Sequence, residues 1–142
     1  MSESKNVWHP LKRALDNRNW AYQRLEDRIT PGIPDVNVHI PDLGDVWIEL
    51  KEIEQKSVNS FLVGVEREQF IWLRQGILDG RKCGLLGRLG DDWLLLGGIE
   101  ALRRAKAPQT KENLYRDAVL FKSPDEFLSF AQTNNLNEFG QI

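Results

Sequence analysis

The sequence predicts an α/β fold in which a central mixed β-sheet is flanked by helices. Two short segments, 35–40 and 46–51, alternate apolar and polar residues as half-buried strands do. A helical segment at about 66–79 follows them, and a second pair of strand-like segments comes after that helix. Strands and helices that alternate along a chain are typical of this fold class.

Length and composition indicate a single domain. The chain has 142 residues, of which 41% are hydrophobic, and no linker rich in proline, glycine and serine divides it. We therefore expect one domain over residues 1–142, in which 99–142 form a C-terminal extension with a strand and a helix.

The elements before the first strand pair and just after it follow from local signals. A first helix ends near 16–19, and the residues from Trp20 to Arg24 indicate a strand. The segment 52–64 is polar and without a clear period, so we expect an irregular stretch beside the site where substrate is gripped.

The second half of the chain contains one hairpin, one strand and one helix. Segments 83–89 and 93–96 flank a Gly-Asp-Asp turn and predict a hairpin. Residues 119–121 predict a strand. Ser123 and Glu126 then supply an N-cap and a capping-box acid for a last helix.

The first hairpin has a register that the apolar pattern predicts. If the buried faces of 35–40 and 46–51 coincide and the loop has three residues, Val36 pairs with Ile48. Asp35 then lies directly across from Glu49, with β-carbons about 4.5–5.5 Å apart. Lys51 lies on the same face as Glu49 because strand side chains alternate.

This arrangement predicts a metal-assisted phosphodiesterase. Two carboxylates at that distance repel one another unless a cation lies between them. Oxygen ligands favour Mg²⁺ or Mn²⁺, which keep bound waters and accept a phosphate oxygen. Lys51 is placed to orient the attacking water or to stabilise the charge that develops during hydrolysis.

Gly32-Ile33-Pro34-Asp35 followed by Glu49-Leu50-Lys51 resembles the motif of the PD-(D/E)xK nuclease superfamily. The chain is most similar to small virus-type replication-repair nucleases and to archaeal-type Holliday junction resolvases, over roughly residues 1–97. The resemblance implies a restriction-endonuclease-like core and a metal-dependent nuclease. It assigns Asp35 and Glu49 as metal ligands and Lys51 as the catalytic lysine.

Two further residues enter through the same resemblance. The superfamily usually adds a glutamate from its first helix, for which Glu3 is the candidate and Glu26 the substitute. Pro10 also suits the first turn of a helix that begins at residue 9 or 10, in which case Glu3 lies in a leader before that helix. Gln69 matches a glutamine on the helix after the lysine strand, and either serves the water and phosphate or is a satisfied core glutamine.

The net charge of −2 conceals clusters of basic residues. A basic groove for a nucleic acid is one interpretation of these clusters, and a solvated surface is the other. The residues that we assign to nucleic-acid binding are Arg81, Lys82, Arg103, Arg104 and Lys106.

Remaining features limit the class of protein. The single cysteine, Cys83, excludes an internal disulfide and a cysteine-based zinc site. Without a signal peptide or a long apolar run we expect an intracellular protein that is not membrane-bound, whether cellular or virus-encoded and acting in a host cell. Trp47 and Trp72 are candidates for stacking on bases or for a subunit interface.

The expected function is that of a Mg²⁺-dependent endodeoxyribonuclease for branched DNA, of the Holliday junction resolvase kind. Symmetric cutting of a four-way junction requires a two-fold homodimer. The alternatives are a general or nicking nuclease for DNA or RNA with the same fold, and a nucleic-acid-binding protein with an inactive site.

Overall fold

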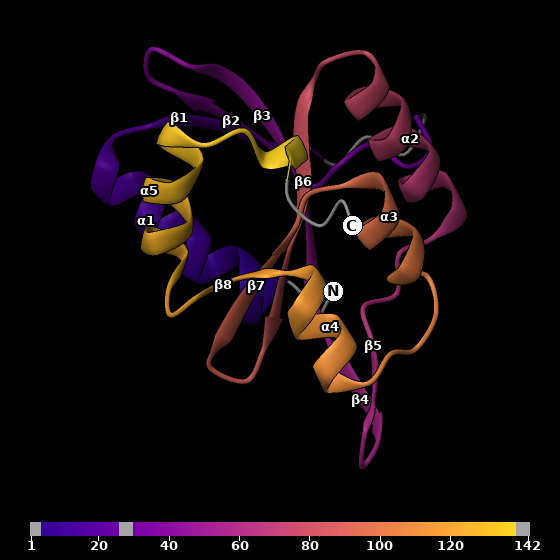
Figure 1. The fold of residues 1–142 in the computed structure, drawn as a ribbon. Helices are drawn as coiled ribbons and strands as arrows, with labels where there is room; N and C mark the ends of the chain where they lie inside the picture. The colour runs from indigo at the N-terminus through magenta and orange to yellow at the C-terminus, as the bar shows by residue number, and fades with distance from the viewer. Residues whose placement is uncertain (1–3, 26–29, 139–142) are drawn as a thin grey trace.

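The computed structural model describes residues 4–25 and 30–138 and contains the α/β architecture that the sequence predicts (Figure 1). Its centre is a six-stranded sheet in the order β1-β2-β3-β6-β7-β8. Only β3 and β6 run parallel, so the sheet is mixed. The strands are β1 (Ala21–Arg24), β2 (Val36–Ile40), β3 (Gly44–Glu52), β6 (Lys82–Leu89), β7 (Asp92–Leu96) and β8 (Val119–Phe121).

Helices cover both faces of this sheet. One face is covered by η1 (Ser4–Trp8), α1 (His9–Arg18) and α5 (Pro124–Thr133). The opposite face is covered by α2 (Arg67–Leu78), α3 (Ile99–Arg104) and α4 (Lys111–Asp117). A short 3₁₀ turn, η2 (Leu136–Glu138), follows α5. Each helix layer contributes to its own hydrophobic cluster, and the sheet separates the two clusters.

The side chains of β3 alternate between the two clusters, and this alternation decides on which face of the sheet its polar residues lie. Val46, Ile48 and Leu50 belong to the cluster under α1 and α5, whereas Trp47 packs with α2. Because side chains alternate along a strand, Glu49 and Lys51 lie on the same face as Trp47.

The helix ends agree with the sequence signals. Pro10 lies in the first turn of α1, which begins at His9, and the preceding η1 is a short π-helical segment. The hydroxyl of Ser123 accepts a hydrogen bond from the backbone N–H of Glu126 at 3.2 Å and caps α5. Arg18 of α1 then donates to Asp125 of α5 at 2.8 Å, which joins the two helices of this layer.

The prediction of an irregular segment over 52–64 is wrong. It contains β4 (Glu54–Ser57) and β5 (Ser60–Leu62), an antiparallel hairpin that forms a separate two-stranded sheet and extends away from the rest of the molecule (Figure 1). Every residue of β4 is exposed. A strand without a buried face has no reason to alternate apolar and polar residues, so the sequence carries no strand signal there.

Tyr115 joins α4 to β7, because its hydroxyl donates to the carboxylate of Asp92 at 2.7 Å. Burial, followed by this hydrogen bond, raises the pKa of Tyr115 to about 12 from 10.0. Because folding raises the pKa of Tyr115, the protonated phenol stabilises the folded protein. This stabilisation is fully present below pH 10 and is lost as the pH rises through about 12.

We therefore expect a titration of phenolate absorbance to show Tyr115 ionising near pH 12. The chain has two tyrosines, so Tyr115→Phe leaves the signal of Tyr22 alone. The wild-type protein should also lose stability over this alkaline range more steeply than Tyr115→Phe in urea unfolding. Equal slopes would show that the phenol of Tyr115 is not held protonated by the fold.

Within the described residues, no helix is both long enough and apolar enough to cross a membrane.

Candidate active site

The hairpin of β2 and β3 has the predicted register. Val36 pairs with Ile48 and Val38 with Val46, and residues 41–43 form the loop. Asp35 directly precedes β2, and the same register places it across from Glu49. The carboxylate Oδ2 of Asp35 accepts the backbone N–H of Leu50 at 2.8 Å, so this side chain reaches the backbone of β3 beside Glu49. The structure thus brings the two predicted acids to adjacent positions of neighbouring strands.

Glu49 is a buried carboxylate, with 2% of its surface exposed. The ammonium Nζ of Lys51 lies 3.7 Å from its Oε2, and the side chain of Lys51 is also mostly buried. Burial removes the hydration of a charged group, so a buried acid is stabilised only by cations or hydrogen-bond donors nearby. The site therefore presents an acid and an amine that are both largely removed from water.

Arg24 is a site residue that the sequence analysis did not identify. Its Nη1 donates to the backbone oxygen of Asp35 at 2.9 Å and lies 3.5 Å from the Oδ1 of the same residue. The guanidinium also lies over the ring of Trp8, 5.2 Å from the centroid. β1 pairs with β2 antiparallel, so the approach of Arg24 to Asp35 depends on a strand pairing that no local motif reveals.

Gly32 determines how the loop before Asp35 meets α2. Its φ of +80° lies in the left-handed region, and a β-carbon there would be 2.1 Å from the backbone oxygen of Glu68. Only glycine allows so close an approach. Gly32 thereby lets the segment that ends in Pro34 and Asp35 lie directly on the first turn of α2.

The amide oxygen of Gln69 has a structural partner. It accepts the backbone N–H of Glu66 at 3.0 Å, in a capping box at the start of α2. This bond holds the first turn of the helix that Gly32 contacts. The sequence did not reveal this box, because its usual signature has Ser or Thr at the N-cap and α2 has Glu66 there.

The residues at the site suit a hard divalent cation in chemical type. Asp35 and Glu49 offer carboxylate oxygens, the ligands that Mg²⁺ and Mn²⁺ prefer. Among residues 4–25 and 30–138, no group of three or more acidic, histidine or cysteine side chains is gathered as a metal site. Glu3 and Glu26, the two candidates for a third carboxylate, lie outside the described residues.

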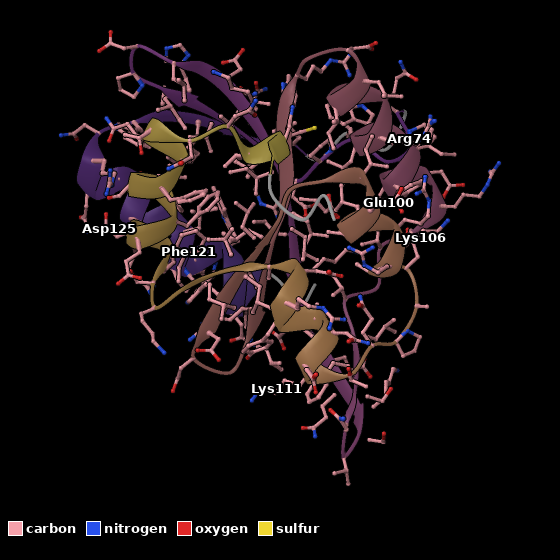
Figure 2. The ribbon with its side chains drawn as sticks, in the orientation of Figure 1. Arg74, Glu100, Lys106, Lys111, Phe121 and Asp125 are labelled. Atoms are coloured by element: carbon pink, nitrogen blue, oxygen red, sulfur yellow. The ribbon has the colours of Figure 1, made fainter. Side chains whose placement is uncertain are left out.

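The five predicted nucleic-acid-binding residues do not share one environment. Arg81 lies over the ring of Trp72 at 5.0 Å, and Lys106 lies over Phe70 at 4.8 Å, as does Arg103 at 5.6 Å. These three are exposed around α2 and α3, and Figure 2 shows Lys106 on the outer side of α3. Lys82 is half-buried where β6 begins.

Arg104 has a structural role. Its guanidinium makes two hydrogen bonds with the buried carboxylate of Asp117, at 2.7 and 2.9 Å, and ties α3 to α4. The hydrogen bond with Asp117 raises the pKa of Arg104 above its ordinary value.

We expect Asp117→Asn to lower the free energy of unfolding by about 2 kcal/mol, because a charged, two-bond contact in a buried position is lost. Urea unfolding measures this. Asp125→Asn is the matched control, because Asp125 makes an exposed ion pair with Arg18. This variant should lower the free energy of unfolding by at most about 1 kcal/mol. Equal losses in the two variants would show that the contact between α3 and α4 is no stronger than a surface pair.

Trp47 and Trp72 contact one another, with ring centroids 5.5 Å apart. Both are only partly buried and pack against the cluster under α2 and α3. The two rings thus pack α2 against the sheet.

The mixed six-stranded sheet with helices on both faces is a restriction-endonuclease-like α/β fold. Among solved structures, the chain is similar to Hjc, a Holliday junction resolvase from the archaeal hyperthermophile Archaeoglobus fulgidus. The TM-score is 0.50 at 18% sequence identity, and the alignment covers 87% of this chain and 97% of that one. No protein-family model matches the sequence, and no curated protein matches it either. The similarity to that structure confirms the predicted fold class.

Proposed function

We propose that the protein is a Mg²⁺- or Mn²⁺-dependent endodeoxyribonuclease that hydrolyses phosphodiester bonds in branched DNA, as a Holliday junction resolvase. The observation that carries the proposal is the placement of Asp35 beside Glu49, with Lys51 3.7 Å from the buried Glu49 carboxylate. An acid pair with a neighbouring lysine provides the groups that metal-assisted phosphodiester hydrolysis needs.

Each side chain has a distinct part in this proposal. Asp35 and Glu49 would hold the cation, together with Glu3 or Glu26. The cation would lower the pKa of a bound water and polarise the phosphate oxygen. Lys51 orients the attacking water and stabilises negative charge on the phosphate. Arg24 holds Asp35 in place through its contacts with the backbone oxygen and the carboxylate.

Gln69 is proposed as an auxiliary residue. Its amide oxygen caps α2, which leaves the amide N–H groups on Nε2 to donate to water or to a phosphate oxygen. The capping bond also fixes the side-chain direction, because the oxygen is already engaged.

The preference for branched DNA is supported by the similarity in fold to an archaeal Holliday junction resolvase, which extends over most of both chains. A four-way junction has two equivalent strands to cut, so a two-fold homodimer would present two sites in the required symmetry. The exposed basic residues around α2 and α3 would contact phosphates and make binding sensitive to salt. The protein would act inside cells, where such DNA forms.

The test is a gel assay on a labelled four-way junction and on linear duplex of matched sequence, with Mg²⁺ or Mn²⁺. We expect paired, symmetric nicks in the junction from the wild-type protein and none from Lys51→Ala. Lys12→Ala, which removes an exposed lysine of α1, is the matched control and should cut normally.

Three results would contradict parts of the proposal. Equal cutting of junction and duplex would indicate a general nuclease, and cutting of RNA in preference to DNA would change the substrate. Binding without cleavage in both metals would indicate a nucleic-acid-binding protein with an inactive site.

A further inference from the structure

The β4–β5 hairpin presents an apolar side chain to solvent at its tip. Val58 is 94% exposed, whereas the other exposed large hydrophobic residues in the described part of the chain are 47–57% exposed. The tip has a two-residue turn, because Ser57 pairs with Ser60. An apolar side chain at the tip of a projecting turn is accessible to a partner.

The hairpin is firmly attached to the rest of the protein. Phe61 at its base is buried in the cluster under α2 and α3, and its backbone exchanges two hydrogen bonds of 2.8 Å with Gln109. The side chain of Asn59 accepts the backbone N–H of Lys111 at 3.1 Å. The amide of Gln55 donates to the backbone oxygen of Ser57 at 3.0 Å. These contacts make the hairpin a fixed projection.

The hairpin also has a fixed position relative to the proposed catalytic residues. It leaves the end of β3, the strand that contains Glu49 and Lys51, so the length of extended chain between Lys51 and Val58 limits their separation to about 23 Å. On the neighbouring strand, Gly87 pairs with Lys51, and Leu89 and Gly90 follow it at the β6–β7 turn.

Two hollows lie beside this turn. One, of about 340 Å³, is lined by Asn6, Glu52, Ile53, Arg88 and Gly90. The other, of about 640 Å³, also reaches Gly90 and extends to Val58. The larger hollow therefore links the β6–β7 turn to the tip of the hairpin.

The larger hollow is lined by the ring of Tyr115, by two exposed lysines and by two aspartates, Asp91 and Asp92. Lys111 lies over the ring of Tyr115 at 5.2 Å, and Figure 2 shows Lys111 at the end of α4 next to the hairpin. Lys122 lies 3.5 Å from the carboxylate of Asp92, which also accepts the hydroxyl of Tyr115. Lysines beside an aromatic ring suit a nucleotide, whose phosphate is anionic and whose base stacks on rings.

We propose that the β4–β5 hairpin is a wedge for the branch point of DNA, with Val58 inserted between bases and the hollow beside Tyr115 holding a displaced nucleotide. The inference rests on the proposed function and adds the part of the DNA that the hairpin binds. Apolar side chains that enter base steps have to overcome the stacking energy of those steps. This cost is smallest at a branch point, where stacking between neighbouring base pairs is already interrupted.

The test uses a four-way junction with 2-aminopurine at the crossover, and a linear duplex with the same base at the same sequence position. With Ca²⁺ in place of Mg²⁺ to prevent cleavage, the wild-type protein should raise the fluorescence of the junction by unstacking the probe. Val58→Ser should remove this rise and weaken junction binding about tenfold, in line with the loss of one buried apolar side chain. Val58→Leu keeps an apolar side chain at the tip, so this variant should retain both the fluorescence rise and the affinity for the junction.

Leu120→Ser is the matched control, because Leu120 is an exposed apolar residue on β8 outside the hollow. It should leave the fluorescence rise unchanged. Val58→Ser should also leave the cutting of linear duplex unchanged where the wild-type protein cuts it.

The outcomes separate this inference from the proposed function. A wild-type protein that binds and cuts the junction without a rise at the crossover, or with the same rise in Val58→Ser, overturns the wedge and leaves the nuclease proposal in place. A protein that neither binds nor cuts any DNA overturns both.

Discussion

Glu49→Gln is expected to lower the rate of DNA cleavage by about a hundred- to a thousandfold, a loss comparable with the removal of one key electrostatic group from an active site. The amide keeps the size and shape of the side chain but removes the negative charge that would hold the cation beside Asp35. Cleavage of a labelled junction under single-turnover conditions measures the rate, and a higher Mg²⁺ or Mn²⁺ concentration should not restore it fully.

The same variant has a second expected effect that separates a loss of chemistry from a loss of folding. Glu49 is 2% exposed, and a buried charge costs folding free energy that a neutral amide avoids in part. The change also removes the carboxylate partner of the largely buried Lys51 ammonium, which opposes this gain. Thermal unfolding without divalent ions should therefore show Glu49→Gln folded, with a free energy of unfolding within about 2 kcal/mol of the wild type. Glu112→Gln, an exposed change on α4, is the control for both assays. A stable Glu49→Gln protein that cleaves normally would show that this carboxylate is not part of the catalytic site.

Gly32→Ala is expected to lower the free energy of unfolding by at least about 2 kcal/mol, from the cost of a left-handed residue together with overpacking. The new β-carbon would lie 2.1 Å from the backbone oxygen of Glu68, so the loop or the first turn of α2 has to move. Because Asp35 follows three residues later, the displacement should also reduce cleavage. Urea unfolding and the junction assay measure the two effects.

Gly80→Ala separates the two causes of that loss. Gly80 has a φ of +85°, similar to the +80° of Gly32, but a β-carbon there would have no neighbour within 4 Å among the described residues. Because only backbone strain is introduced, this variant should lower the free energy of unfolding by about 1 kcal/mol. It should leave the rate of DNA cleavage unchanged. Equal losses at the two glycines would mean that the contact between the loop and α2 is loose.

The first hairpin could be predicted in detail because its two strands are joined by a short loop. The apolar alternation of 36–40 and 46–50 allows few registers, and a slip by one residue would turn the buried faces outward. The predicted pairing of Val36 with Ile48 is confirmed for this reason. The second hairpin, over β6 and β7, and the start of α5 are confirmed for the same kind of local reason.

Contacts between distant segments were beyond sequence reasoning. Arg24 approaches Asp35 because β1 lies beside β2, and Arg104 is bound by Asp117 because α3 and α4 pack together. Neither pair has a sequence spacing that implies contact. The helices α3 and α4 were not predicted at all, since each is only six or seven residues long and gives too short a pattern.

By itself, the sequence determined the fold class, the register of the first hairpin and the alternation that puts Glu49 and Lys51 on one face, because these depend on interactions between residues close together in the chain. Only the tertiary structure decided that Glu49 is buried, that Gly32 lies against α2 and that a rigid hairpin projects from the end of β3. The physical reason is that burial and close approach depend on which distant segments pack together, and side-chain patterns within one segment carry no record of that packing.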